Sequence, residues 1–121
     1  MLPWTSGRSF EIWRYGAGHS QLQMYSADDD PLLRVLILFE SVEFMSLRRT
    51  YRDLTLDFAD EANDPSGRVI SADSSLRLSV TGTAAAGVII CARVTVVRVS
   101  DAPRTWLPDD SEPIFSLSAP G

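Results

Sequence analysis

The sequence contains no lysine, a single cysteine (Cys91) and a single histidine (His19) among its 121 residues. One cysteine excludes an internal disulfide framework. With one histidine beside it, the chain also lacks the ligands of the usual zinc sites. We therefore expect no metal and no cofactor, and we expect the Cys91 thiol, which has apolar neighbours, to behave as a small buried hydrophobic group.

The basic residues are all arginine, eleven of them, against sixteen acidic residues. The formal net charge is −5 and the sequence pI is about 4.7. Proteins that bind nucleic acids carry a concentrated basic surface, so this balance argues against a nucleic-acid partner. The exclusive use of arginine is typical of the codon bias of a GC-rich bacterial genome.

Long hydrophobic runs are also absent. The longest apolar stretch, residues 32–39, is interrupted by Arg34 and is much shorter than the roughly 20 residues that span a bilayer. Residues 1–10 lack the charged start and apolar core of a secretory signal peptide. We therefore expect no membrane association and a cytoplasmic location.

Hydrophobic residues recur with a period of two along most of the chain, which is typical of β-strands. Residues 9–15 and 21–25 alternate in this way and are separated by Gly16-Ala17-Gly18, so they predict an N-terminal hairpin. The alternation places Phe10 and Ile12 on one face of the first strand, and Trp13 and Tyr15 on the other.

Further strands are expected along the rest of the chain. Residues 32–39 are almost uniformly apolar, which favours a central strand covered on both faces. Residues 53–58 place Leu54, Leu56 and Phe58 inward, and residues 87–99 form the longest strand candidate. The predicted core includes Leu36, Leu38, Leu54, Leu56, Leu78 and Ile90.

The fold class that follows is all-β: an antiparallel β-sandwich or a partly open barrel of about seven to eight strands. Residues 41–52 read either as an alternating strand with a bulge or as one short helix, since Val42, Met45 and Arg49 have helical spacing. We expect residues 1–108 to form a single domain. Residues 109–121 are expected to form an irregular tail because the C-terminal segment is rich in proline.

His19 follows the glycine-rich turn and is the natural candidate for a general base. A catalytic histidine needs a partner that orients its ring. The neighbouring Ser20 points to the opposite face of an extended chain, so a Ser–His pair is not expected. We predict a turn histidine without a catalytic role, and a hydrolase centred on His19 is the weakest of three functional alternatives.

Two acidic clusters fall in predicted connections: Asp28, Asp29 and Asp30 in one, and Asp60, Glu61 and Asp64 in the other. Carboxylate oxygens suit calcium, but neither stretch has the spacing of a dedicated calcium loop. We expect solvated turns, which recognition residues often occupy on a rigid sheet. If they contact a partner, its face should be basic.

Arg48, Arg49 and Arg52 form the basic cluster of the sequence. Guanidinium groups at this spacing suit a carboxylate or phosphate ligand. They equally suit ion pairs with the acids of residues 53–60, or protection of a sheet edge against aggregation. Since the chain is acidic overall, we expect the structural role.

Trp13, Tyr15 and Tyr25 are candidates for a sugar-stacking or protein-binding surface. Because Phe10 and Ile12 already provide an apolar face, both faces of the first strand are apolar and the second must be covered. We expect the C-terminal segment with Trp106 to cover it, and a partner is the alternative.

The segment from Phe10 to Phe58 resembles small uncharacterised actinobacterial β-domain proteins with the spacing W-x-Y-x-x-x-H-x-x-L, carried here by Trp13, Tyr15, His19 and Leu22. More distantly, it is similar to immunity-type bacterial proteins, which block a toxin by binding it. The resemblance implies a small β domain with a partner-binding role and assigns no functional residue.

Two functions remain in play. The first is a non-enzymatic bacterial protein-interaction module, immunity-like or regulatory, with an acidic surface. The alternative is a small-molecule or carbohydrate-binding domain in which Trp13, Tyr15 and Tyr25 line a pocket. Homo-oligomerisation is left open by the sequence.

Overall fold

The computed structural model describes residues 2–18, 20–27, 34–59 and 75–119. In these ranges the chain forms eleven β-strands and no helix. The strands are β1 (Trp4–Thr5), β2 (Phe10–Gly16), β3 (Gln21–Ser26), β4 (Val35–Glu40), β5 (Phe44–Ser46), β6 (Thr50–Tyr51), β7 (Thr55–Phe58), β8 (Leu76–Gly82), β9 (Ala85–Cys91), β10 (Arg93–Arg98) and β11 (Glu112–Ser118). The all-β prediction is confirmed, with more strands than the seven or eight expected.

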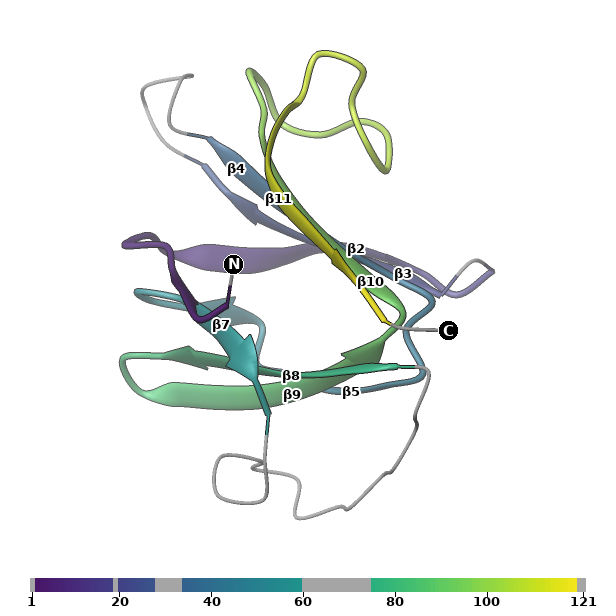
Figure 1. The fold of residues 1–121 in the computed structure, drawn as a ribbon. Coiled ribbons are helices and arrows are strands. Elements are labelled where there is room, and N and C mark those ends of the chain that lie inside the picture. The colour runs from purple at the N-terminus through teal and green to yellow at the C-terminus, as the bar shows by residue number, and fades with distance from the viewer. Residues whose placement is uncertain (1, 19, 28–33, 60–74, 120–121) are drawn as a thin grey trace.

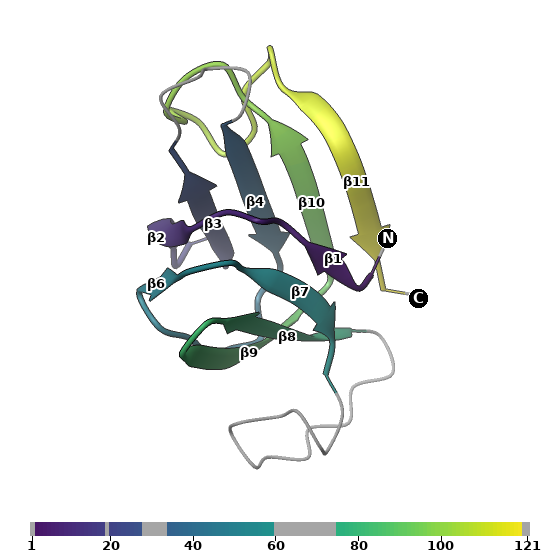
Figure 2. The ribbon, with the colours of Figure 1, turned by 90° about the vertical axis from the view of Figure 1, so that its left-hand side faces the viewer.

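The strands form two antiparallel sheets packed face to face, as in a β-sandwich (Figure 1). Sheet A has the order β1-β7-β8-β9-β5, and sheet B has the order β11-β10-β4-β3-β2-β6. Figure 2 shows the strands of sheet A running across those of sheet B. Within the described residues the two sheets stay separate and do not close into a barrel.

The space between the sheets is filled by one apolar cluster, to which the long strands contribute alternate residues. The register aligns Leu22, Phe39 and Val94 on neighbouring strands, so that a row of side chains crosses sheet B. The residues predicted as core are all at most 2% exposed: Leu36, Leu38, Leu54, Leu56, Leu78 and Ile90. That prediction is confirmed.

The segment predicted as one long strand, residues 87–99, is divided between β9 in sheet A and β10 in sheet B. The chain passes between the sheets at Ala92, whose N–H donates to the carbonyl of Glu40 (3.0 Å) and whose carbonyl accepts from Ala119 (2.8 Å). The prediction was wrong because both strands are buried in the same core and no glycine or proline marks the crossing.

The irregular tail expected over residues 109–121 is also wrong for Glu112–Ser118. This segment is β11, which pairs with β10 and packs Phe115 and Leu117 against the core. Pro113 lies on an edge strand beside a register shift at Val96 and Val97, where a missing backbone N–H is tolerated. Proline content therefore misidentified an edge strand as coil.

Residues 41–52 contain the short strands β5 and β6, so the helix alternative is wrong. Phe58 differs from expectation in its burial. It pairs with Leu78 and therefore lies on the inward side of β7, but it is the last residue of that strand and is 51% exposed. The strand reaches past the edge of the apolar cluster at this point.

Candidate functional site

Several residues singled out from the sequence lie outside the residues that the structure describes. These are His19, Asp28, Asp29, Asp30, Asp60, Glu61 and Asp64. The expected roles of this histidine and of the two acidic clusters therefore stay predictions.

The aromatic set Trp13, Tyr15 and Tyr25 does not share one face of sheet B. A register shift between Ile12 and Arg14 makes Trp13 the extra residue of a bulge. Tyr15 then pairs with Leu22, a core residue, whereas the Trp13 ring packs edge-on against Tyr25, with 5.1 Å between ring centroids. The expectation that Trp13 and Tyr15 point the same way is wrong, because a bulge reverses the alternation.

Part of the outer face of sheet B is covered by residues 101–111, which lie between β10 and β11 and which we call the strap (Figure 1). Its Ala102 packs on an apolar cluster on this face, formed by Tyr25, Leu36, Val97 and Val99. Burial in this cluster raises the pKa of Tyr25, an effect that Arg34 partly offsets and Asp101 reinforces. This cluster lies on β3, β4 and the end of β10, so it does not itself cover the aromatic strand β2.

Polar contacts attach the strap to the sheet. Trp13 Nε1 donates to the Pro103 carbonyl (3.1 Å), and Gln23 Nε2 donates to the carbonyls of Thr105 (2.8 Å) and Trp106 (2.9 Å). The Arg14 guanidinium lies 4.3 Å from the centre of the Trp106 ring. The expected cover of the aromatic strand by the C-terminal segment with Trp106 is therefore confirmed in part, since Trp13 remains 41% exposed.

Cys91 is fully buried in β9, and burial raises the pKa of its thiol to about 12. The thiol is therefore neutral and unreactive at physiological pH, as a buried structural cysteine is expected to be. In the described ranges, no three His, Cys, Asp or Glu side chains gather in a way that could hold a metal ion.

A groove of about 450 Å³ lies beside the arginines of the sequence cluster, and we call it the arginine groove. One wall comes from the chain around β6 and the other from the turn between β8 and β9. The lining residues are Arg48, Arg49, Thr50, Arg52, Thr83, Ala84 and Ala85. Arg48, Arg49 and Arg52 are all exposed, so three guanidinium groups border one open depression.

The backbone that carries these arginines is held by hydrogen bonds to its surroundings. The Arg48 N–H donates to the Tyr51 hydroxyl (2.8 Å), and the Arg52 carbonyl accepts from the Thr83 N–H (2.9 Å). The Arg49 carbonyl accepts from a backbone N–H of β2 (2.9 Å). Burial raises the pKa of Tyr51, and Arg48 partly offsets the shift. The arginines thus extend from a fixed framework.

The three arginines form no ion pair with any residue that the structure describes. Two of the acids expected to neutralise them are engaged elsewhere. Asp53 accepts a hydrogen bond from the Thr83 hydroxyl (3.3 Å), and Asp57 accepts one from the Phe58 N–H (2.8 Å). Ion pairing with these acids, one of two structural alternatives, is therefore wrong for Asp53 and Asp57, and Asp60 lies outside the described residues. The other alternative, protection of a sheet edge, stays a prediction; β6 is the outermost described strand of sheet B.

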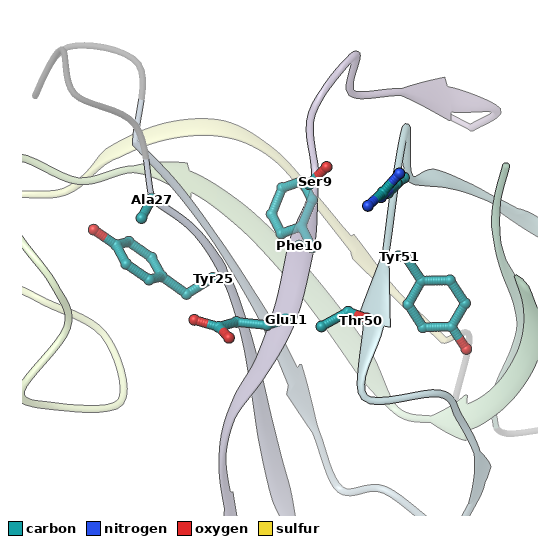
Figure 3. Close-up of a pocket in the computed structure, with 8 residues that line it drawn as sticks. Ser9, Phe10, Glu11, Tyr25, Ala27, Thr50 and Tyr51 are labelled. Carbon is teal, nitrogen blue, oxygen red and sulfur yellow. The ribbon is translucent and has the colours of Figure 1, made fainter.

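A second depression, of about 370 Å³, lies on the other side of β6 and is shown in Figure 3. We call it the tyrosine pocket. It shares Thr50 and Arg52 with the arginine groove, so the two depressions adjoin. Its lining residues are Ser9, Phe10, Glu11, Tyr25, Ala27, Thr50, Tyr51 and Arg52.

The strand register explains how the tyrosine pocket is built. Glu11 pairs with Tyr25 on one side and with Thr50 on the other, so these three side chains form a row on the outer face of sheet B. Figure 3 shows the Glu11 side chain extending toward Tyr25. An acidic group therefore lies in this pocket, next to a groove bordered by cationic groups.

Charge is distributed unevenly along the chain. The described residues contain ten arginines and nine acidic residues, whereas the remaining residues contain one arginine and seven acidic residues. The net charge of −5 therefore originates outside the sheets and their described connections. An acidic composition does not prevent this framework from carrying a local cationic site.

Sequence reasoning identified the arginines because they are near neighbours in the chain. It did not identify Glu11, on β2, or Thr83, in the turn between β8 and β9, as part of the same site. A polar residue between apolar ones, such as Glu11, only indicates an outward-facing side chain, so no sequence signal connected it to the arginines.

Comparison with family models, curated proteins and solved structures gives no match for this chain. The described part of the chain has no helix of a length and hydrophobicity that would cross a membrane. The geometry of the arginine groove and the tyrosine pocket is therefore the basis for assigning a function.

Proposed function

We propose that this domain is a non-enzymatic protein-interaction module, and that its arginine groove binds an acidic segment of another protein. The observation that carries the proposal is the set of three exposed guanidinium groups, bordering one groove and unpaired with any described acidic side chain. Guanidinium groups bind carboxylates through paired, charge-assisted hydrogen bonds. A segment with two or three carboxylates would supply the missing counter-charges.

An extended peptide segment suits the shape of the site. The groove is open and is joined along β6 by a second depression, so a ligand several residues long is accommodated. In addition, β6 pairs with β2 on one side and with none of the described strands on the other. In an antiparallel pair, hydrogen-bonded and non-hydrogen-bonded residue pairs alternate. The Ile12 N–H donates to the Arg49 carbonyl next to the Glu11–Thr50 pair, so Glu11 and Thr50 form a non-hydrogen-bonded pair. The backbone N–H and carbonyl of Thr50 therefore point away from β2. These groups can bond to the backbone of a bound segment at the point where the segment crosses β6.

The acidic clusters Asp28–Asp30 and Asp60, Glu61 and Asp64 would contribute in a different way. We propose that they face a basic part of the same partner and accelerate its association, because charges at the rim of an interface act mainly on the association rate. The partner would then carry charges of both signs.

Titration of a fluorescently labelled hexaglutamate peptide tests the proposed site. The test variant replaces Arg48, Arg49 and Arg52 with alanine. A matched control replaces three exposed arginines outside the groove, Arg93, Arg98 and Arg104, so that both variants lose the same charge. We expect the groove variant to bind the peptide at least about ten-fold more weakly than the control.

Equal weakening in both variants would show that the peptide senses only the overall charge, and the groove would not be the site. Absence of binding to the unmodified protein at low ionic strength would also contradict the proposal. Chemical-shift changes should be centred on Thr50, Thr83 and Ala84 if the peptide lies in the groove. Thermal melting of each variant verifies that the fold is intact.

A further inference from the structure

We infer that the acidic segment recognised by the arginine groove also carries a lysine or arginine about three residues from its carboxylates, and that this cationic side chain is bound in the tyrosine pocket. The inference rests on the proposed function, because it assigns the second half of the same ligand. It specifies a bipartite motif in place of a general acidic peptide.

The chemistry of the tyrosine pocket favours a side chain with an apolar stem and a cationic end. Ala27, which is exposed, and the edge of the buried Tyr25 line the pocket and give a small apolar surface for the methylene groups. Glu11 provides a carboxylate that is exposed and that has no ion pair with the described residues. A volume of about 370 Å³ is ample for one lysine or arginine side chain.

The charges along the site orient the ligand: Arg52 borders both depressions, whereas Glu11 lines only the tyrosine pocket, beside Tyr25. A purely acidic segment extending from the arginine groove into the tyrosine pocket would place a carboxylate next to Glu11, and the two charges would repel. A cationic residue at that position replaces repulsion with attraction. Glu11 therefore selects against uniformly acidic segments, and this unfavourable contact is itself a source of specificity.

The spacing follows from the dimensions of a sheet. The two depressions lie on either side of β6 and share Thr50 and Arg52. Since neighbouring strands are about 4.8 Å apart, the two sites are separated by roughly two strand spacings, or about 10 Å. An extended chain rises about 3.3 Å per residue, so about three residues connect the carboxylates to the cationic side chain.

Four short peptides test the motif. Two place three glutamates and one lysine at the ends of a two-glycine spacer, in the orders EEEGGK and KGGEEE. The other two replace lysine with norleucine, which retains the four-carbon chain and lacks the charge. We expect one of the two orders to bind about two- to five-fold more tightly with lysine than with norleucine, as for a partly exposed ion pair.

The variant Glu11→Gln should abolish this preference while still binding the norleucine peptides. Because Glu11 is exposed, the variant is expected to fold, and a melting curve checks this. The control Glu112→Gln, at an exposed position on β11, should retain the preference. A lysine preference that is absent in the unmodified protein, or that survives in Glu11→Gln, would overturn the inference.

Failure of this inference and failure of the proposed function give different results. If all four peptides bind equally and the replacement of Arg48, Arg49 and Arg52 weakens them together, the acidic-segment site stands and the bipartite motif is wrong. If none binds the unmodified protein, the proposed function itself is contradicted.

Discussion

The inner face of sheet B and the part of its outer face beneath the strap are both buried, but by different means. The inner face packs on sheet A through aliphatic side chains that alternate along paired strands. This part of the outer face is covered by the strap, whose backbone carbonyls accept hydrogen bonds from Trp13 and Gln23. The first contact relies on non-directional apolar burial, whereas the second depends on a few directional bonds around a small apolar cluster.

This difference leads us to expect different responses to substitution. When a side chain between the two sheets is truncated, the cavity that it leaves persists, because every surrounding side chain is held by paired strands. A cavity left beneath the strap is bordered on one side by the strap itself, which has no strand pairing. The strap can therefore move closer to the sheet and fill part of the cavity. Substitutions that remove hydrogen-bonding atoms should lower the stability more at the strap than at the inner face, because hydrogen bonds attach the strap to the sheet.

The largest expected effect comes from truncating the inner face. Leu56→Ala removes a fully buried side chain from the main cluster and should lower the free energy of unfolding by roughly 2–5 kcal/mol. Leu36→Ala, at an equally buried position beneath the strap, should lower it by an amount near the bottom of this range. Urea denaturation of both variants measures the difference. A larger loss for Leu36→Ala would reverse the comparison.

The next effect concerns the polar attachment of the strap. Gln23→Met retains much of the side-chain volume but leaves the carbonyls of Thr105 and Trp106 without their donor. It also removes the acceptor for Arg14 Nε, so we expect a loss of about 1–3 kcal/mol.

Gln21→Met is the matched control for this substitution, because Gln21 lies on the same strand and is only partly buried. The backbone carbonyl chemical shifts of Thr105 and Trp106 should change in Gln23→Met and not in Gln21→Met. Unchanged shifts in both variants would show that the strap is held by its apolar contacts instead.

A smaller effect is expected where the strap approaches the sheet most closely. A Cβ atom on Gly16 would lie 2.5 Å from Cζ2 of Trp106, so Gly16→Ala must displace that ring from its position over Arg14. Because Trp106 is only half-buried and has room to move, the cost should be about 1 kcal/mol.

Gly18→Ala provides the control, since a Cβ atom there meets nothing within 4 Å. Tryptophan fluorescence should shift in Gly16→Ala and stay unchanged in Gly18→Ala. Identical spectra for Gly16→Ala and the unmodified protein would mean that the sheet moves and the ring does not.

The comparison between the two faces also separates what the sequence predicts from what it does not. Alternation identified the inner residues, including Leu54, Leu56 and Leu78, because burial against a sheet imposes a period of two. The same pattern gave no information about which sheet a strand joins. The crossing at Ala92 was missed for this reason, since a strand buried in one sheet resembles a strand buried in the other.

The outer face was harder to predict because it depends on departures from regular geometry. The bulge at Trp13 adds one residue and reverses the direction of Tyr15, which no local pattern indicated. The candidate site is similar: the arginines are adjacent in sequence, but Glu11 and Thr83 reach them only through strand pairing and a turn. Long-range register, more than residue type, decides which side chains meet.

The smallest expected effect is a pH dependence of the free energy of unfolding. It compares a buried titratable group on the inner face, Cys91, with one beneath the strap, Tyr25. Burial raises the pKa of Cys91, in the inner cluster, to about 12 from its usual 9.0. The folded protein therefore keeps this proton where the unfolded chain loses it, so the free energy of unfolding falls as the pH rises from about 9 toward 12. By pH 9.5 the fall should be a little under about 1 kcal/mol relative to pH 7.5. Tyr25, beneath the strap, also has a raised pKa, but its usual value is 10.0, so its contribution begins at higher pH.

Urea denaturation at the two pH values should therefore give a steeper loss for the unmodified protein than for Cys91→Ala, and Tyr25→Phe should match the unmodified protein. Equal losses in the unmodified protein and Cys91→Ala would show that the thiol is hydrated or ionised in the folded state, and that the inner face is less completely closed than the apolar contacts indicate.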